Sequence, residues 1–359
     1  MGDLTDTTEN VGATAGSGTA GPGPAVHSDP TGASDPGGAP DPAGGPDPVG
    51  AGDPAGPDPA TPADTAAAFE AHRPHLLGVA YRMLGSIADA EVVVQEAWLR
   101  LARVDPASIH DLRGWLTTVT GRLCLDRLRA VRAAREAYVG PWLPEPLVAR
   151  QPSTDPDPAD VAVLAESVRM ALLLVLERLT PEQRVAFVLH DVFSVPFDEV
   201  AGALGVSTEA ARQLASRGRR AVAAEAPRRP PPREQQRAIL ERFLDAAAGG
   251  DLDALLALLA PDVELQSDGG GLVTAARRPI RGADKVGRFL LGLTTRGAGT
   301  EFAVEPTTVN GQWGAVVRII REDGGREPFA VFVADVTAAG AIDRISFVLN
   351  PEKLTRVPR

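Results

Sequence analysis

The stretch "LTPEQRVAFVLHDVFSVPFDEVAGALGVSTEAARQLASRGRRAV" (residues 179–222) decides how the middle of the chain folds. Thr180 is a good helix cap, and Pro181 suits the first helical position. Residues 198–204 predict a short helix that ends at Gly205, and Ser207 can cap a second helix after it. The apolar and small residues have the spacing of a helix-turn-helix: Ala201, Leu204, Gly205, Val206, Ala210 and Leu214.

The outward face of the second helix is polar and basic, and such side chains can reach base edges in a major groove. Between residues 210 and 233 there are seven Arg and one acid. A helical hairpin in an ordinary core would share the apolar pattern but not the basic face. We therefore expect DNA contacts from this helix and its cap: Ser207, Glu209, Arg212, Gln213, Ser216, Arg217, Arg219 and Arg220. Of these, Arg219 and Arg220 are expected on the phosphate side.

A first block, residues 65–137, is predicted to be helical from its apolar periodicity. Gly85-Ser86 divides its first part into two helices. A third pattern, residues 111–136, has an apolar stripe opposite an Arg-rich face, with six Arg and two acids in residues 111–135. An amphipathic helix of this kind can lie along a phosphate backbone. A solvated charged face is the alternative interpretation of this helix taken alone.

Residues 1–64 differ from the rest in composition. They hold 26 Gly and Pro, ten acids and no Lys or Arg, and they have neither a secretory signal nor a collagen repeat. We expect a disordered acidic tail, because so few large apolar side chains cannot offset the entropy of ordering. The formal net charge of −11 is mostly this tail's −10, so it does not argue against nucleic-acid binding elsewhere.

Cofactor chemistry finds little support in the composition. The single cysteine, Cys124, excludes an internal disulfide and any Cys-based metal cluster. No apolar run is long enough to span a bilayer, so we expect a cytoplasmic chain that is not a membrane protein. We predict no cofactor, no metal site and no catalytic residue.

The last block, residues 234–355, changes pattern from two helices to alternating strands. Helices followed by a curved antiparallel sheet suggest an α+β cone around a pocket. This order is similar to the SnoaL-like, nuclear-transport-factor-2-like fold, which includes both small enzymes and binding domains. The block contains no His, and a lone carboxylate such as Asp335 is usually structural, so we predict that it is not an enzyme. An unidentified small ligand of the cone is left open.

Together, "DAEVVVQEAWLR" (89–100), "LTTVTGRLCLDRLRAVRAARE" (116–136) and the helix-turn-helix resemble the extracytoplasmic-function (ECF) sigma factors of bacterial RNA polymerase. The resemblance implies two all-α domains, region 2 at 65–137 and region 4 at 160–226, that bind core polymerase and promoter DNA. It implies −35 recognition by the helix-turn-helix and −10 recognition by Arg122, Arg127, Arg129, Arg132 and Arg135. It implies polymerase contacts from Asp89, Glu91, Gln95, Glu96 and Trp98. Family members often have Asp where Val92 stands and Asn where Arg122 stands.

The linker, residues 138–159, contains "WLPEP", and "DGGG" (268–271) and "NPEKL" (350–354) occur in the last block. This combination resembles the SigJ-like subfamily, and it implies that the fused domain replaces a separate anti-sigma factor. We expect the linker to dock on that domain through Trp142, Leu143, Pro144, Glu145, Pro146, Asp268, Gly269, Gly270, Gly271, Asn350, Pro351, Glu352, Lys353 and Leu354. Glu145 is expected to meet Lys353 or an Arg of the last block. A stiff spacer is the alternative for the linker.

The leading functional prediction is a sigma factor that directs transcription initiation, with the fused domain modulating it. The alternative is an autonomous helix-turn-helix regulator with a ligand-sensing domain, which would bind a promoter without polymerase. A small-molecule enzyme carrying a DNA-binding appendage is disfavoured by the absence of His from residues 234–359.

Overall fold

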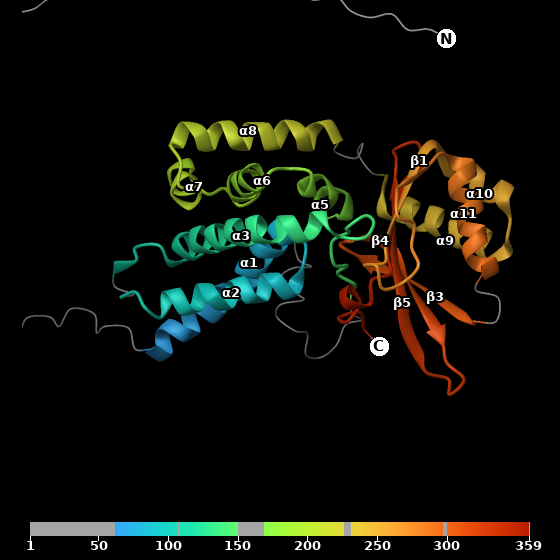
Figure 1. The fold of residues 1–359 in the computed structure, drawn as a ribbon, viewed down its shortest axis with the longest axis horizontal. Coiled ribbons are helices and arrows are strands. Elements are labelled where there is room, and N and C mark those ends of the chain that lie inside the picture. The colour runs from blue at the N-terminus through green and yellow to red at the C-terminus, as the bar shows by residue number, and fades with distance from the viewer. Residues whose placement is uncertain (1–61, 106–107, 150–168, 226–230, 297–299, 359) are drawn as a thin grey trace, which may run out of the picture. The chain divides into compact units, whose positions relative to one another are not determined.

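The computed structural model describes residues 62–105, 108–149, 169–225, 231–296 and 300–358, and the fold is drawn in Figure 1. The first domain consists of three helices: α1 Pro62–Leu84, α2 Ile87–Leu101 and α3 Leu112–Glu136. Gly85 has φ +68, and Ser86 caps α2 through its hydroxyl, so the predicted break falls at Gly85-Ser86. The apolar stripe of α3 faces the core, where Leu116, Leu125 and Leu128 are buried.

The N-terminal end of α1 differs from the prediction, because residues 62–64 were assigned to the tail and lie in the helix. Pro62 suits the first helical position, Asp64 interacts favourably with the helix dipole, and three alanines follow. The rest of the predicted tail, residues 1–61, lies outside the described residues, as does the linker from residue 150 on.

The second domain contains the predicted helix-turn-helix. Its elements are α5 Met170–Glu177, α6 Pro181–Phe187, the π-helix η2 Val188–Val192, α7 Phe197–Leu204 and α8 Thr208–Glu225. Thr180 forms a complete capping box with Gln183 at the start of α6. Gly205 ends α7 in the left-handed conformation, with φ +67, and Ser207 accepts a hydrogen bond from the amide of Ala210. The π-helix was not predicted.

One hydrophobic core joins the two helical domains. It contains buried side chains of α1, α2 and α3 together with those of α5 to α8. Helix α3 packs against both α6 and α7. Helix α3 also approaches η2 closely at Gly121, where a Cβ would lie 2.8 Å from Cδ1 of Leu189. The two domains therefore form one packed unit in this conformation.

The C-terminal domain begins with α9 Arg233–Gly249 and α10 Leu252–Leu258 and is completed by one sheet and α11 Ala283–Arg296. The strands are β1 Leu259–Asp268, β2 Ile280–Arg281, β3 Phe302–Val309, β4 Gln312–Ile320, β5 Arg326–Val336 and β6 Ile342–Val348. Their order is β2-β1-β6-β5-β4-β3. The prediction of an antiparallel sheet was wrong in one pairing, because β1 lies parallel to β6. The crossover through α11 and the β3–β6 meander returns the chain to β1 in the same direction.

The two faces of this sheet have different partners. One face packs against α9, α10 and α11, and its core includes the ring of Phe332, which stacks on Phe347 and meets Phe243 at a tilt. The other face presents a row of valines to Leu143 of the linker and to Met170 and Leu174 of α5. Among the described helices, none is both long and apolar enough to cross a membrane.

Candidate nucleic-acid interface and interdomain junction

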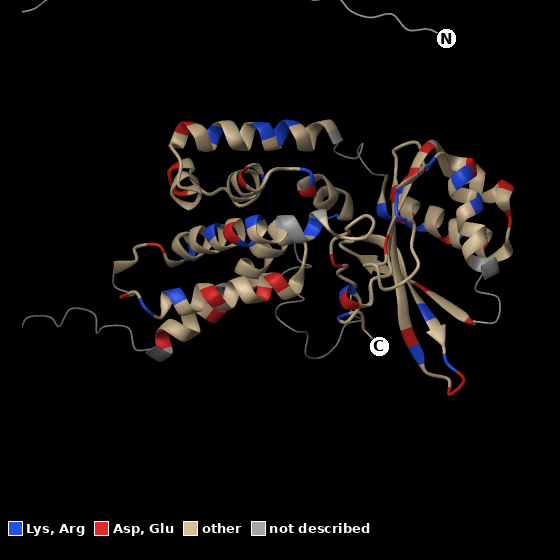
Figure 2. Cartoon of the chain, viewed as in Figure 1, with Lys and Arg blue, Asp and Glu red and all other residues tan. Residues whose placement is uncertain are grey.

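Helix α8, whose Arg positions are blue along the ribbon in Figure 2, carries all but one of the residues predicted to contact the −35 element. Six of them line one shallow surface depression: Glu209, Arg212, Gln213, Ser216, Arg217 and Arg220. Contacts among them are long, 3.8 Å for Arg212 to Glu209 and 3.4 Å for Gln213 to Glu209, and all three side chains are exposed. Exposed pairs of this kind contribute little free energy, so they leave the face available for DNA.

Two of the predicted −35 residues have intramolecular roles. The hydroxyl of Ser207 caps α8. Arg219 binds Asp191 of η2 with Nε 2.6 Å from Oδ1, and this hydrogen bond raises the pKa of Arg219. A phosphate would have to compete with Asp191 for that guanidinium. Arg220 has a hydrogen bond of 3.4 Å to the carbonyl of Ser216 and stays exposed, so its charge is accessible.

The basic face of α3, predicted to contact the −10 element, is largely paired with acids. Arg127 binds Asp89 of α2 at 2.6 Å, and Arg129 binds Glu182 of α6 at 2.8 Å. The side chain of Arg132 lies outside the described residues. Arg122 is exposed and has no ion pair within the described part of the chain.

Arg135 differs most from its predicted role. It forms an ion pair with Glu177 of α5, donates to the carbonyl of Leu84 at 2.8 Å and is partly buried. Burial lowers its pKa, while Glu177 raises it. Glu177 also binds Arg184, at 2.6 Å, so one carboxylate holds a guanidinium from each helical domain. Because its hydrogen bonds are made inside the protein, Arg135 is a structural residue of the junction in this conformation.

Three acids of the second domain thus face α3. Besides Glu177 and Glu182, Glu199 of α7 accepts a hydrogen bond of 3.1 Å from Thr118. These acids stand where DNA phosphates would have to bind if α3 lay along promoter DNA. In this arrangement two Arg of the predicted −10 face, Arg129 and Arg135, are therefore paired with acids of the second domain.

The surface of α2 is accessible but not uniformly polar. Gln95 and Glu96 are exposed, and so are the apolar side chains of Val92 and Leu99, at 58% and 49%. Trp98 packs its ring 5.2 Å from that of Phe69, so part of it belongs to the core. Asp89 pairs with Arg127, and Glu91 pairs with Arg356 near the C-terminus. The exposed apolar pair was missed, although both residues lie outside the buried stripe of the helix.

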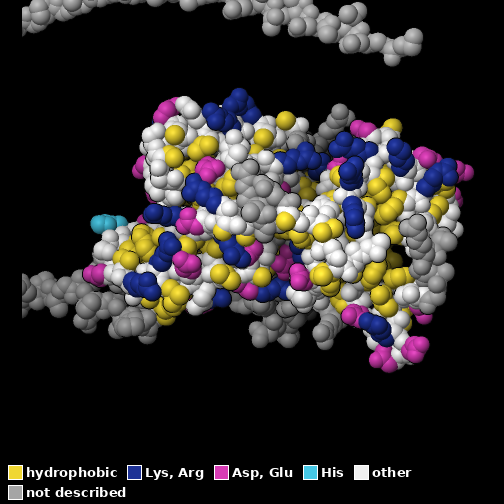
Figure 3. Space-filling model, in the orientation of Figure 1, with side chains coloured by type: hydrophobic (Ala, Val, Ile, Leu, Met, Phe, Trp, Pro, Cys, Tyr) yellow, Lys and Arg dark blue, Asp and Glu magenta, His cyan; other side chains and the backbone are white. Residues whose placement is uncertain are grey.

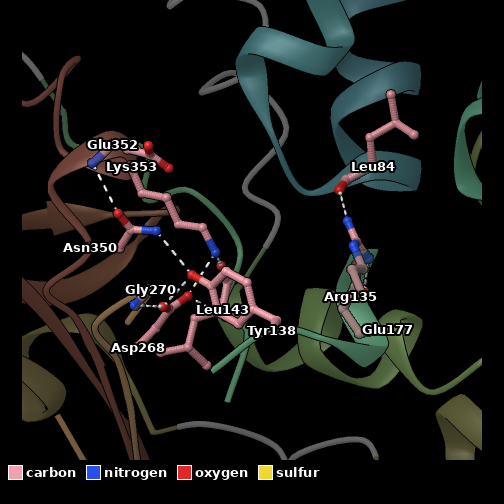
Figure 4. A network of polar contacts seen from close by, with 10 residues as sticks. All are labelled: Leu84, Arg135, Tyr138, Leu143, Glu177, Asp268, Gly270, Asn350, Glu352 and Lys353. Atoms are coloured by element: carbon pink, nitrogen blue, oxygen red, sulfur yellow. Dashed lines mark hydrogen bonds and ion pairs between the residues drawn. The ribbon is translucent and has the colours of Figure 1, made fainter. Parts of the chain in front are cut away.

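The linker and the C-terminal domain meet around Asp268, which is completely buried (Figure 4). Its carboxylate accepts from the hydroxyl of Tyr138 at 2.6 Å, from the amide of Leu143 at 2.8 Å and from the amide of Gly270 at 3.0 Å. Lys353 places its ammonium 2.7 Å from the same carboxylate and also donates to the carbonyl of Leu143. The charge on Asp268 is therefore fully compensated inside the protein.

The motif residues around Asp268 shape this junction. Gly270 and Gly271 have φ +63 and +75, and a Cβ on Gly270 would lie 2.4 Å from Asn350. Asn350 donates to Tyr138 at 2.9 Å and caps the short 3-10 helix η3 Pro351–Lys353 through the amide of Glu352. A Cβ on Gly269 would lie 2.5 Å from a carbonyl oxygen. Pro351 and Glu352 are exposed, and Leu354 is buried among the valines of the sheet.

Trp142 lies between cations of different domains. The guanidinium of Arg135 is 3.8 Å from the centre of the indole, and the ammonium of Lys353 is 4.0 Å from it. The ring also rests on the α1–α2 corner, where a Cβ on Gly85 would lie 2.7 Å from it. The indole therefore contacts both domains, whereas a spacer would pack on the first domain alone.

Glu145 does not pair with Lys353, which binds Asp268; its basic partner is of the other expected kind, an Arg at the C-terminal end of the chain. Its Oε2 accepts from the amide of Ile87 at 2.8 Å, its backbone amide donates to Gly85, and Arg356 is 4.0 Å away. Burial raises the pKa of Glu145. The side chain thus satisfies an orphan amide at the start of α2, which local sequence could not indicate. Pro144 and Pro146 on either side of it are buried.

Comparison with known proteins places this geometry in a family. Residues 68–134 match Sigma-70 region 2, residues 169–222 match Sigma-70 region 4, and residues 240–345 match the SnoaL-like domain. Over 293 residues the chain is 48% identical to ECF RNA polymerase sigma factor SigJ of Mycobacterium tuberculosis, which covers 81% of this chain and 93% of that protein. The chain belongs to the ECF sigma factors.

A solved structure and a second mycobacterial sigma factor are also similar to this chain. The crystal structure of Mycobacterium tuberculosis SigJ matches with a TM-score of 0.65 and 45% identity, covering 81% of this chain and 98% of that one. The probable ECF sigma factor SigI of the same organism is 39% identical over 230 residues, covering 63% of this chain and 76% of that protein. As an ECF sigma factor, the chain directs transcription initiation by RNA polymerase.

The SnoaL-like domain of this ECF sigma factor contains one unusual carboxylate. Asp335 is buried on the sheet face that meets α5 and accepts from Gln312 at 3.0 Å. Burial raises its pKa to about 6. Within the described residues, no group of His, Cys, Asp and Glu side chains is arranged to hold a metal ion.

Proposed function

We propose that this ECF sigma factor reads the −35 element with α8 and the −10 element with α3, while α2 binds the core polymerase. The proposal for α8 rests on an exposed row of polar and basic side chains with weak internal contacts, and basic side chains lie at the surface over this helix in Figure 3. Gln213 and Arg217 have the donors that recognise purine edges in a major groove. Arg219 and Arg220 bind phosphates of the DNA backbone.

The polymerase contact is proposed for the outer face of α2. Gln95 and Glu96 supply polar groups there, and Val92 and Leu99 supply apolar area that is exposed in the free protein. Exposed apolar side chains grouped with polar ones are typical of protein interfaces. Asp89 and Glu91 reach polymerase only by exchanging their present partners, Arg127 and Arg356.

The fused domain controls whether these faces can be used, in place of a separate anti-sigma factor. The observation that carries this proposal is the junction at Asp268, which fixes the linker between regions 2 and 4 to the C-terminal domain. While the linker is held, region 4 stays on α3 and its acids stay on Arg129 and Arg135. Promoter binding in the cytoplasm then requires the two helical domains to separate.

The experiment is transcription from the target promoter with reconstituted polymerase, comparing the full chain with a chain truncated after residue 235. The truncation removes Asp268, Asn350 and Lys353 together, so we expect a changed transcript yield. Trp142→Ala in the full chain should change the yield in the same direction, because it removes the ring between Arg135 and Lys353. Equal yields from all three proteins would contradict a regulatory domain.

Core-polymerase binding separates this function from an autonomous helix-turn-helix regulator. A sigma factor co-purifies with the core enzyme and depends on it for transcription. Promoter binding with no affinity for core would favour the regulator instead.

A further inference from the structure

Asn310 is buried although it lies in a hairpin turn, where side chains are usually exposed. It lies in the two-residue turn between β3 and β4, and it is 1% exposed. Asn310 and Gly311 have φ +49 and +70, as an Asn-Gly hairpin turn requires. Hairpin tips are normally solvated, so the burial of this one means that other parts of the chain cover it.

The side chain of Asn310 connects two distant segments. Its Oδ1 accepts from the amide of Leu147 in the linker at 3.1 Å, and its Nδ2 donates to the hydroxyl of Tyr81 in α1 at 2.8 Å. Tyr81 in turn donates to the carbonyl of Glu145 at 2.8 Å. Tyr81 is fully buried, and this burial raises its pKa, so the phenol stays protonated and able to donate.

The backbone around Asn310 adds to this contact. The amide of Asn310 donates to Leu147, and the amide of Ala149 donates to Thr308, both at 2.8 Å. Val148 pairs with Val309 as an antiparallel bridge. Since β3 is the edge strand of the sheet, the linker satisfies backbone groups that would otherwise be unpaired.

This contact is separate from the one at Asp268. Asp268 ends β1, Asn310 follows β3, and the strands β6, β5 and β4 lie between β1 and β3 in the sheet. The groups that bind Asp268 are Tyr138, Leu143, Gly270 and Lys353, and none of them contacts Asn310 in the described hydrogen bonds.

We propose that Asn310 is a positioning residue that anchors helix α1 of region 2 to the C-terminal domain through Tyr81, independently of Asp268. The inference rests on the proposed function, in which the C-terminal domain controls the promoter-binding faces. Two anchors on different strands hold the linker at both ends of its docked part. Region 2 is released only when both of them open.

The experiment is hydrogen–deuterium exchange of the full chain, compared with Asn310→Gly and Tyr81→Phe variants. Gly keeps the left-handed turn, and Phe keeps the buried ring, so each change removes mainly the side-chain hydrogen bonds. The matched control is Asp323→Gly, in the exposed turn between β4 and β5 of the same sheet. We expect the amides of Leu147 and Ala149 to exchange about fivefold faster in both anchor variants.

The amides of Leu143 and Gly270 donate to Asp268, and their hydrogen-exchange rates should stay within about twofold of the parent rates. Adding Tyr81→Phe to Asn310→Gly should give less than the sum of the two single effects on the free energy of opening, because both changes cut one shared bond. An unchanged rate at Leu147 and Ala149, or equal loosening at Leu143 and Gly270, would overturn the inference. Transcription from the truncated chain tests the proposed function separately, since exchange rates do not depend on polymerase.

Discussion

Replacing Asp268 with Asn tests the junction at its most buried charge. The side chain of Asp268 is 0% exposed and that of Lys353 is 13% exposed, and the Lys353 ammonium lies 2.7 Å from the Asp268 carboxylate. Asn keeps the shape of the side chain and one acceptor oxygen but leaves that ammonium without its counter-ion. Removing one partner of a buried ion pair costs about 3–5 kcal/mol.

Part of that cost is recovered locally. Lys353 still donates to the carbonyl of Leu143 at 2.5 Å and still lies 4.0 Å from the centre of the Trp142 ring. A partly desolvated cation–π contact is worth about 1 kcal/mol, so we expect a net loss of about 2–4 kcal/mol in the free energy that closes the junction. The assay is native-state hydrogen exchange at the amides of Leu143 and Gly270, both of which donate to Asp268. Protection should fall about 30- to 800-fold.

A second substitution separates charge from packing. Lys353→Met removes the ammonium that Asp268→Asn leaves without a counter-ion. The double variant should therefore lose less free energy of junction closure than the sum of the two single losses, by about 1.5 kcal/mol or more. Burial lowers the pKa of Lys353 and Asp268 raises it, so the loss in Asp268→Asn alone should shrink at alkaline pH, where the stranded amine releases its proton. Strictly additive effects would refute the ion pair as the source of the closure energy.

Three further predictions concern the DNA-binding faces and the buried acid. Arg217→Ala or Gln213→Ala should weaken −35 binding by about 1–3 kcal/mol and change base preference in a binding titration; the same loss on every sequence would assign the side chain to phosphate. Glu182→Gln should free Arg129 and strengthen binding to −10 DNA by up to about fivefold at low salt, with Glu241→Gln on α9 as the control; equal affinities would show that Glu182 does not mask α3. Asp335 has a folded pKa of about 6 against an ordinary value of 3.8, so the unfolded chain releases this proton at a lower pH than the folded chain does. The free energy of unfolding should therefore fall by about 3 kcal/mol as the pH rises from about 4 to about 6. Urea titrations should show this slope in the parent and not in Asp335→Asn, and an unchanged slope would mean that another group titrates.

Local sequence predicted the helices well because their signals are local. The cap at Thr180, the break at Gly85 and the left-handed end at Gly205 each depend on one or two residues, and each lies where expected. The Asn-Gly pair at 310–311 is an equally local hairpin signal. It indicates a turn, but it cannot indicate that Tyr81 covers the turn from a helix 229 residues away.

The contacts between domains were harder to predict because they join residues with no fixed spacing. Arg129 and Arg135 have the composition of a DNA-binding face, and their pairing with Glu182 and Glu177 depends on how α3 packs against the second domain. Glu145 and Lys353 have opposite charges, yet Lys353 pairs with Asp268, because the pairing depends on where the linker docks on the last block and not on charge alone. The parallel pairing of β1 with β6 likewise follows from the crossover through α11.

Pro144 and Pro146 set the register of the docked linker. Leu143, Glu145, Leu147 and Ala149 all donate their backbone amides, to Asp268, Gly85, Asn310 and Thr308 respectively. Pro144 and Pro146 have no amide hydrogen and stand between these donors, where none is required. Inserting or deleting one residue before Pro144 would bring a proline to a position that must donate. Surface connections usually tolerate such changes in length, whereas this one is expected to be as intolerant of them as a buried strand.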